Sequence, residues 1–237
     1  RTSDKVFINV DNPHLCQMAA ERNLQSDPER PYSLLLPYGL DYQGGVVLFS
    51  DEKHPFLSIL CGGVLINTNL VGSYNADNVM AAIAVGVHFG VSFEDAVKAI
   101  EAYVPSNNRS QMTKTELNTL IIDAYNANPT SMAAALENFS NVSADCRIAM
   151  LGDMLELGED SGAEHKAVIE SALSRGFCKV FFVGKEFGAV SVDSDNAMFF
   201  LTSDELADYL KTNQVHGATI LIKGSRGTRM EKVIPVL

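Results

Sequence analysis

The second half of the sequence alternates between short apolar runs and longer segments of helical character. Five runs have the length and the β-branched composition of strands: Thr119–Asp123, Arg147–Leu151, Lys179–Val183, Met198–Leu201 and Thr219–Lys223. The stretches between them read as helices at about 130–141, 162–175 and 203–212, with one short turn at 186–190. Apolar strands that alternate with helices are typical of a parallel sheet covered on both faces. This pattern predicts an α/β fold, a doubly wound, mostly parallel, Rossmann-like domain.

The first hundred residues combine short strand-like runs with helical segments. A strand-like run at Val6–Val10 is followed by Asn12-Pro13, which is typical of a helix start. Glycine and asparagine punctuate further extended runs and favour an antiparallel hairpin set, and two helices follow. The predicted runs are 33–36, 45–49, 56–61 and 64–67, and the predicted helices are 75–89 and 92–102. Residues 104–110 are rich in turn formers, so we expect a domain boundary there, with residues 1–104 and 105–237 on either side.

Composition excludes several classes of protein. The formal net charge of −11 argues against a broad nucleic-acid surface, which needs clustered Lys and Arg. No apolar run approaches the roughly 18–20 residues that a membrane helix needs. The four cysteines are far apart and lack metal-ligand spacing, so we expect reduced thiols, no metal site and a cytoplasmic protein.

Ligands of open parallel sheets bind beyond the carboxyl ends of the strands, so the segments after the strands are the candidate sites. The first is Asp123-Ala-Tyr-Asn-Ala-Asn-Pro129, where a carboxylate, a phenol and two amides precede a helix. The carboxylate at the strand end suits ribose hydroxyls. The alternative is that Asp123 and the asparagines only cap and turn the chain, as such residues often do.

Two further loops carry opposite charges. The loop after the second strand holds Asp153, Glu156, Glu159 and Asp160, which could bind an ammonium group or could form a solvated acidic loop. The loop after the last strand is basic. Its cations are Lys223, Arg226, Arg229 and Lys232. Arginine forks beside a glycine-rich turn can bind a carboxylate or a phosphate, although the cations could equally be solvated.

No nucleotide-binding fingerprint is present in these 237 residues, because neither GxxxxGK[ST] nor GxGxxG occurs. In the first domain, Asn75 and Asn78 lie on one face of a predicted helix, where an amide can pair with an adenine edge. A helix-capping role of Asn75 is the alternative. None of the five histidines belongs to a recognisable nucleophile motif.

Three strings, however, are specific. They are Asp123-Ala-Tyr-Asn-Ala-Asn-Pro-Thr-Ser-Met132, Leu151-Gly-Asp-Met-Leu-Glu-Leu-Gly-Glu-Asp160 and Ile222-Lys-Gly-Ser-Arg-Gly-Thr-Arg-Met-Glu-Lys232. In type and order they resemble the Mur ligases, a family of ATP-dependent amide ligases of peptidoglycan precursor synthesis. The resemblance is greatest to the ligase that joins D-alanyl-D-alanine to UDP-N-acetylmuramoyl-tripeptide through an acyl phosphate. It implies that residues 1–104 are the latter part of the central ATP-binding domain and that 105–237 are the C-terminal domain.

The resemblance also implies roles for individual residues. Arg109 matches a catalytic arginine that reaches the ATP phosphates, and Asp123 matches the acidic residue on the ribose. The further positions that it implies for ATP binding are Asn75, Asn78, Tyr125, Asn126 and Asn128. Lys223 and Arg226 fall where related ligases recognise the incoming amino acid. The chain departs from the family at Tyr74, where the family has a histidine.

Other expected parts are absent from this sequence. Arg1 opens the chain without an initiator Met, and neither the phosphate-gripping loop nor a UDP-sugar domain is recognisable. We therefore expect a part of a longer enzyme that uses ATP and Mg²⁺, with no cofactor tightly bound to this part and no activity of its own. Two alternatives remain: a non-catalytic nucleotide- or dipeptide-binding module, or another Mur-like ligase. No nucleic acid and no membrane insertion are expected.

Overall fold

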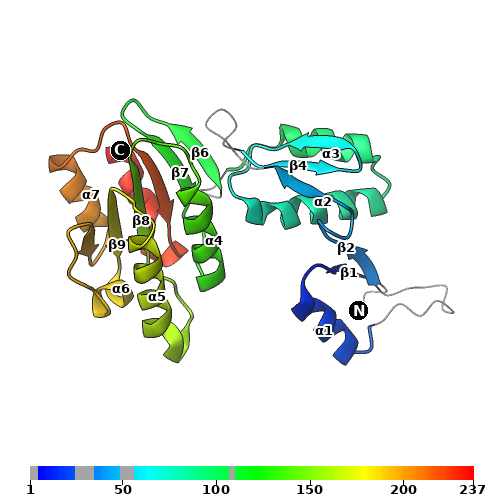
Figure 1. Cartoon of the computed structure of the whole chain (residues 1–237), viewed down its shortest axis with the longest axis horizontal. Helices are drawn as coiled ribbons and strands as arrows, with labels where there is room; N and C mark the ends of the chain where they lie inside the picture. The colour runs from blue at the N-terminus through cyan, green and yellow to red at the C-terminus, as the bar shows by residue number, and fades with distance from the viewer. Residues whose placement is uncertain (1–4, 25–34, 49–55, 107–109) are drawn as a thin grey trace. The chain divides into compact units, whose positions relative to one another are not determined.

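A computed structural model describes residues 5–24, 35–48, 56–106 and 110–237, which form two compact units (Figure 1). The described part of the first unit reaches to Asn69 and resumes at Ser73–Tyr103. The second unit contains Leu70–Gly72 and Val104–Leu237. Among the described residues, no helix combines the length and the apolar character that crossing a bilayer requires.

The first unit holds two small sheets. Its elements are β1 (Val6–Asn9), α1 (Pro13–Glu21), β2 (Leu35–Tyr38), β3 (Val46–Leu48), β4 (Ser58–Cys61), β5 (Val64–Asn67), a 3₁₀ turn η1 (Ser73–Asn75), α2 (Ala76–His88) and α3 (Phe93–Ala102). The antiparallel prediction is confirmed for β3, β4 and β5. It is wrong for the run at 33–36, because β2 pairs in parallel with β1. The physical reason is that α1 lies between these strands, and a helical crossover returns the chain in the same direction.

Local capping explains two of these helices. The side chain of Asn12 accepts hydrogen bonds from His14 and Leu15 N–H, so α1 begins where the sequence predicts. The hydroxyl of Ser92 accepts from the N–H of Asp95 (3.1 Å) at the start of α3.

The second unit is built on a six-stranded sheet in the order β10-β9-β8-β11-β7-β6. The strands are β6 (Gln111–Lys114), β7 (Thr119–Asp123), β8 (Arg147–Gly152), β9 (Lys179–Val183), β10 (Ala197–Phe200) and β11 (Thr219–Lys223). The last five are parallel, as predicted, and β6 pairs antiparallel with β7 at the edge. The strand β6 was not predicted, because its residues are mostly polar, as those of edge strands often are.

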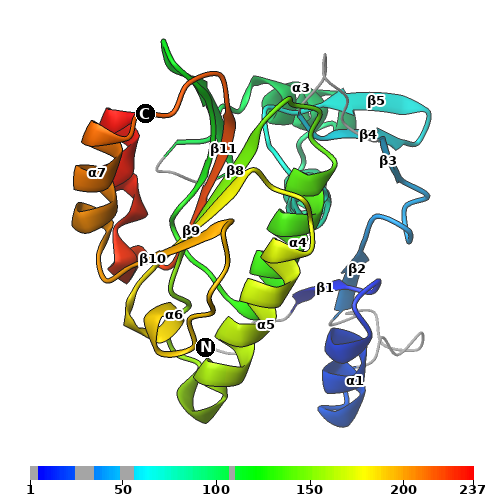
Figure 2. The same ribbon diagram turned by 60° about the vertical axis from the view of Figure 1, so that its left-hand side comes forward.

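Helical segments cover both faces of this sheet (Figure 2). One layer holds α4 (Pro129–Ser140), α5 (Ser161–Leu173) and α6 (Lys185–Ala189), with a 3₁₀ turn η2 (Gly158–Asp160) before α5. The other holds α7 (Ser203–Thr212) and a 3₁₀ segment η4 (Met230–Val236), which follows the short turn η3 (Arg226–Thr228). The doubly wound prediction is therefore confirmed.

Alternate strand residues form the two cores. Phe181 of β9 packs in a cluster with Leu206 and Leu210 of α7, whereas Phe182 contacts Phe187 of α6 at a ring-centroid distance of 4.9 Å. Burying each such side chain contributes about 1.5–3 kcal/mol. This two-sided burial explains why the strands are apolar along their whole length.

The register of the central strand positions the candidate site. Lys223, the last residue of β11, lies opposite Asp123 of β7 and Leu151 of β8. The loops after β7, β8 and β11 therefore leave the sheet together, at what we call the carboxyl edge. The opposite side, where β7, β8, β9 and β11 begin, is the amino edge.

Candidate functional site

A buried ion pair lies at the carboxyl edge. The ammonium of Lys223 is 2.5 Å from the carboxylate of Asp123, and the two side chains are 2% and 14% exposed. Lys223 also donates to the carbonyl of Asn126 (3.4 Å), and Asp123 accepts from the N–H of Ser110 (3.2 Å). The pair thus fixes the end of β7 against the end of β11.

Ser225 joins the three loops. Its hydroxyl accepts from the N–H of Leu155 (3.1 Å) and donates to the carbonyl of Ala127 (3.4 Å). Its own N–H donates to the carbonyl of Asp153 (3.1 Å), and the side chain is buried. One small hydroxyl residue therefore connects the loops that carry the three family-like strings.

Glycine is required where these loops approach one another. A Cβ at Gly152 would lie 2.5 Å from Thr228 Oγ1, and one at Gly224 would lie 2.8 Å from the same oxygen. Any larger residue at either position would push the loops after β8 and β11 apart.

The exposed part of the site includes the side chains of an arginine and a tyrosine. The guanidinium of Arg226 lies over the ring of Tyr125, 5.4 Å from its centroid, and both side chains reach the solvent. Asn126 is exposed as well, and its Oδ1 accepts from the N–H of Ala127 (2.9 Å). Asn128 accepts from the N–H of Ser131 (2.8 Å) in a reciprocal capping box. Asn128 therefore has a structural role at the start of α4.

The acidic loop after β8 differs from the solvated loop weighed in the sequence. Asp153 is 3% exposed, and its carboxylate accepts from the N–H groups of Glu186 (3.0 Å) and Phe187 (2.9 Å) at the start of α6. Solvation is therefore the wrong description for Asp153, although it holds for Glu156, Glu159 and Asp160, which are exposed. The cap was missed because its partners lie more than thirty residues away.

A buried histidine, His165, lies beside this cap. The Nε2 of His165 accepts from the N–H of Met154 (3.0 Å), and its Nδ1 lies 2.7 Å from the carbonyl of Ser161. This pattern assigns the proton to Nδ1 and makes the ring neutral. The 3.7 Å approach of Nε2 to Asp153 would be an ion pair only with a protonated ring, and the backbone contacts argue against one.

A cavity of about 410 Å³ opens beside these loops at the carboxyl edge. Its lining includes Lys185, Arg229 and Lys232, together with residues at the start of α7. Lys232 forms an ion pair with Asp204, with 2.5 Å between the ammonium and the carboxylate oxygen. Arg229 is exposed, and its backbone is in the left-handed region (φ 51°). Residues other than glycine rarely adopt this conformation, and those that do often lie at functional sites.

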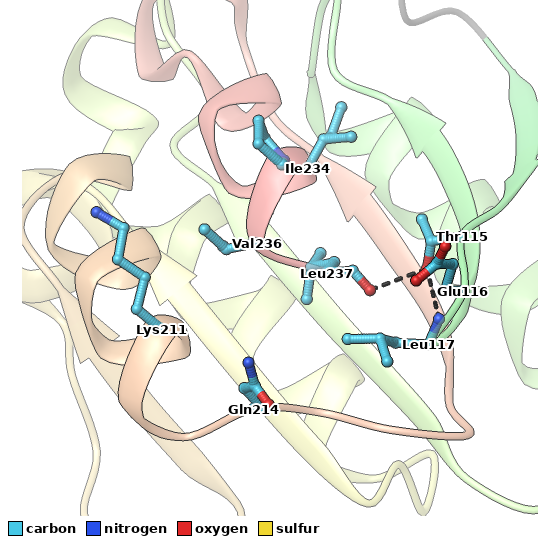
Figure 3. A pocket seen from close by; sticks show the side chains of 9 residues that line it. Thr115, Glu116, Leu117, Lys211, Gln214, Ile234, Val236 and Leu237 are labelled. Atoms are coloured by element: carbon cyan, nitrogen blue, oxygen red, sulfur yellow. Dashed lines mark hydrogen bonds between the residues drawn. The ribbon is translucent and has the colours of Figure 1, made fainter.

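A cavity of the same volume, about 410 Å³, lies at the amino edge (Figure 3). Leu117, Lys211, Gln214 and Leu237 are among its lining residues, and the hydroxyl of Thr115 donates to the carbonyl of Leu237 (2.9 Å). Volume does not distinguish the two cavities, but only the one at the carboxyl edge is lined by residues of the family-like strings.

The remaining predicted residues lie elsewhere. Asn75 and Asn78 belong to the first unit, where Asn78 Nδ2 donates to Asn75 Oδ1 (3.1 Å). Asn75 is buried and occupies the N-cap position of α2, but its side chain makes no capping hydrogen bond. Arg109 lies outside the described residues. Within the described ranges, no group of three or more His, Cys, Asp or Glu side chains is arranged to hold a metal ion.

The chain is similar to a known protein family and to named proteins of other organisms. The family described as "Mur ligase, glutamate ligase domain" matches residues 108–226. The UDP-N-acetylmuramoyl-tripeptide–D-alanyl-D-alanine ligase of Bacillus subtilis is 34% identical over 173 residues, which are 70% of this chain and 38% of that protein. The ligase of the same name from Treponema pallidum is 32% identical over 213 residues, 87% of this chain and 46% of that protein.

A solved structure shares the fold. The MurF ligase of Thermotoga maritima in complex with ADP matches 99% of this chain and 53% of its own, with a TM-score of 0.76 and 18% identity. The chain thus spans less than half the length of the two curated relatives described above. Because the family match covers half of the chain and includes the loops after β7 and β8 and the start of the loop after β11, this chain belongs to the Mur ligase family.

Proposed function

We propose that this chain is part of an ATP-dependent amide ligase that joins D-alanyl-D-alanine to UDP-N-acetylmuramoyl-tripeptide. Two curated relatives that are 34% and 32% identical carry the name of this ligase. The observation that carries the proposal is the joining of the three loops at one edge by the Lys223–Asp123 pair and by Ser225. In such a reaction ATP activates the tripeptide carboxylate, and the dipeptide amine then displaces phosphate.

The proposed nucleotide contacts are those of the loop after β7. Asp123 has a partly exposed carboxylate held by a buried ammonium, so it is positioned to accept from ribose hydroxyls without losing side-chain freedom on binding. Tyr125 and Asn126 are exposed beside it and can line the same surface. In the first unit, the joined amides of Asn75 and Asn78 suit an adenine edge. Arg109 remains the proposed phosphate contact, and Mg²⁺ is expected to accompany ATP in the intact protein.

The proposed dipeptide contacts involve the basic loop after β11. A substrate carboxylate could contact Lys223 directly only by displacing Asp123, because the ammonium is 2% exposed and already paired. We therefore propose that Lys223 positions Asp123 and that Arg226 and Arg229, which are exposed, recognise the carboxylate of the dipeptide. An arginine can form two parallel hydrogen bonds with a carboxylate, which also orients the attacking amine.

The cysteines are consistent with the proposed cytoplasmic location, because Cys16, Cys61, Cys146 and Cys178 are all free thiols.

The test is phosphate release by the intact protein. We expect release to require ATP, UDP-N-acetylmuramoyl-tripeptide and D-alanyl-D-alanine together, and to stop when any one of them is omitted. Equal release with a single amino acid in place of the dipeptide would indicate a different Mur-like ligase. Saturable binding without any release would indicate a binding module. The isolated 237-residue chain should release no phosphate, because it contains no GxxxxGK[ST] loop.

A further inference from the structure

Two cysteines lie on neighbouring strands at the amino edge. Cys146 directly precedes β8, and Cys178 directly precedes β9, its neighbour in the sheet. The N–H of Cys178 donates to the carbonyl of Arg147 at 2.8 Å, so the two cysteines are offset by one residue along the strands. With strands about 4.8 Å apart and a rise of about 3.3 Å per residue, their Cα atoms are about 6 Å apart, within the range that a disulfide spans.

The flanking side chains pack on the α4 side of the sheet. The guanidinium of Arg147 lies 6.0 Å from the ring centroid of Phe177, which in turn packs at 5.2 Å against Phe139 of α4. Cys146 itself packs against the cluster under α7.

The thiols differ in environment. Cys178 is exposed and Cys146 is half-buried, and both are free. Burial raises the pKa of Cys146 to about 11, and a hydrogen bond to the Cys178 side chain adds to the rise. The two side chains therefore lie near each other, and a solute reaches Cys178 first.

We propose that Cys146 and Cys178 form a reversible intramolecular disulfide when the protein meets a peroxide. The Cys178 thiolate attacks the peroxide, forming a sulfenic acid and releasing water or an alcohol. The Cys146 thiol then condenses with the sulfenic acid and releases one water, so that two thiols are oxidised and the peroxide is reduced.

The expected disulfide would link the residue before β8 to the residue before β9. The loop of chain that it closes contains α5. It lies at the end of the strands opposite Lys223 and Asp123, so oxidation should leave that ion pair intact. The modification is thus separate from the residues that we assign to the ligase reaction.

The test treats the native chain with hydrogen peroxide, blocks the remaining thiols with an alkylating reagent and determines the intact mass and the linked peptides. We expect the mass before blocking to fall by two hydrogen atoms, only two of the four thiols to be alkylated afterwards, and one linked pair of peptides to contain Cys146 and Cys178. Dithiothreitol should restore all four thiols.

Single-cysteine variants distinguish the proposed disulfide from other oxidation of the thiols. Cys146→Ser should leave Cys178 to gain oxygen without any link, whereas the matched variant Cys16→Ser should keep the link. The proposal is overturned if the native chain gains oxygen at Cys178 without losing the Cys146 thiol. A disulfide that joins two chains, or that involves Cys16 or Cys61, would overturn it equally.

Discussion

The two edges of the six-stranded sheet are held by different kinds of buried polar residue. At the amino edge, Asn118 is 5% exposed, and its amide donates to the carbonyls of Val215 and Leu237, both at 2.8 Å. Its Oδ1 accepts from the N–H of Ala218 at 3.1 Å. At the carboxyl edge, the corresponding place is taken by the charged pair Lys223–Asp123.

This difference agrees with our proposal that the amino edge is structural and the carboxyl edge functional. The amide of Asn118 pairs with backbone groups, which explains the side chain completely as part of the fold. A buried charge pair costs more to desolvate than an amide, and apolar residues of similar volume often replace such a pair without loss of stability. Since it lies beside the exposed Arg226 and Tyr125, we propose that the pair serves substrate binding as well as folding.

The largest effect is expected from breaking the charge pair. Lys223→Met should lower the free energy of unfolding by about 3–5 kcal/mol, because it removes the buried ammonium that balances the Asp123 carboxylate. Urea unfolding of the chain measures this loss. The matched double variant Asp123→Asn with Lys223→Met should recover most of it. A double variant as unstable as the single one would show that Lys223 acts through packing alone.

A comparable change at the exposed part of the carboxyl edge should act on binding rather than on stability. Arg226→Ala removes only an exposed cation–π contact, worth about 0.5–1 kcal/mol. In the intact protein it should weaken the binding of D-alanyl-D-alanine by about 1.5–3 kcal/mol, the usual contribution of a hydrogen bond to a charged group. Calorimetric titration measures this change, and Arg226→Lys tests whether charge alone is sufficient. Unchanged affinity in Arg226→Ala would remove this residue from the site.

The amino edge should respond in the opposite way. Asn118→Ala should lower the free energy of unfolding by about 1–3 kcal/mol, because buried backbone groups lose their partners. Dipeptide affinity, compared by the same titration, should remain that of the unmodified protein. A loss of affinity larger than the loss of stability would mean that the two edges are not independent.

The smallest expected effect is a pH dependence at the amino edge. The pKa of Cys146 is about 11 in the folded chain against 9.0 for an ordinary thiol, so the unfolded chain ionises first. The contribution of Cys146 is thus fully present below about pH 9 and is lost as the pH rises toward 11. Urea midpoints across this window should fall less steeply in Cys146→Ser than in the unmodified chain. Identical slopes would contradict the assignment.

The sequence predicted the second unit better than the first. Its strands are apolar on both faces, and this single property identified β7, β9 and β11 with their observed bounds. In the first unit, the direction of β2 depends on the crossover through α1, and periodicity carries no information on strand direction. The edge strand β6 has a single apolar residue, Met112, and so gave no strand pattern.

The candidate site was predicted in part. The three loops were recognised from their charged and amide residues, but the pairing of Lys223 with Asp123 depends on the strand order, which places β11 beside β7. The cap that Asp153 forms on α6 depends on an equally distant contact. Gly184, directly before α6, has a positive φ (129°), but in the sequence a glycine alone is too common to identify a cap.

The central claim is that the carboxyl edge of the sheet, and not the amino edge, recognises substrate. It is tested most directly by titrating D-alanyl-D-alanine into the ¹⁵N-labelled chain and following the backbone amide signals. We predict saturable shifts in the loops after β7, β8 and β11, centred on Arg226 and Arg229, with residues 115–118 and 234–237 unchanged. Shifts that cluster around Thr115 and Leu237 instead, or no saturable shifts anywhere, would contradict the claim.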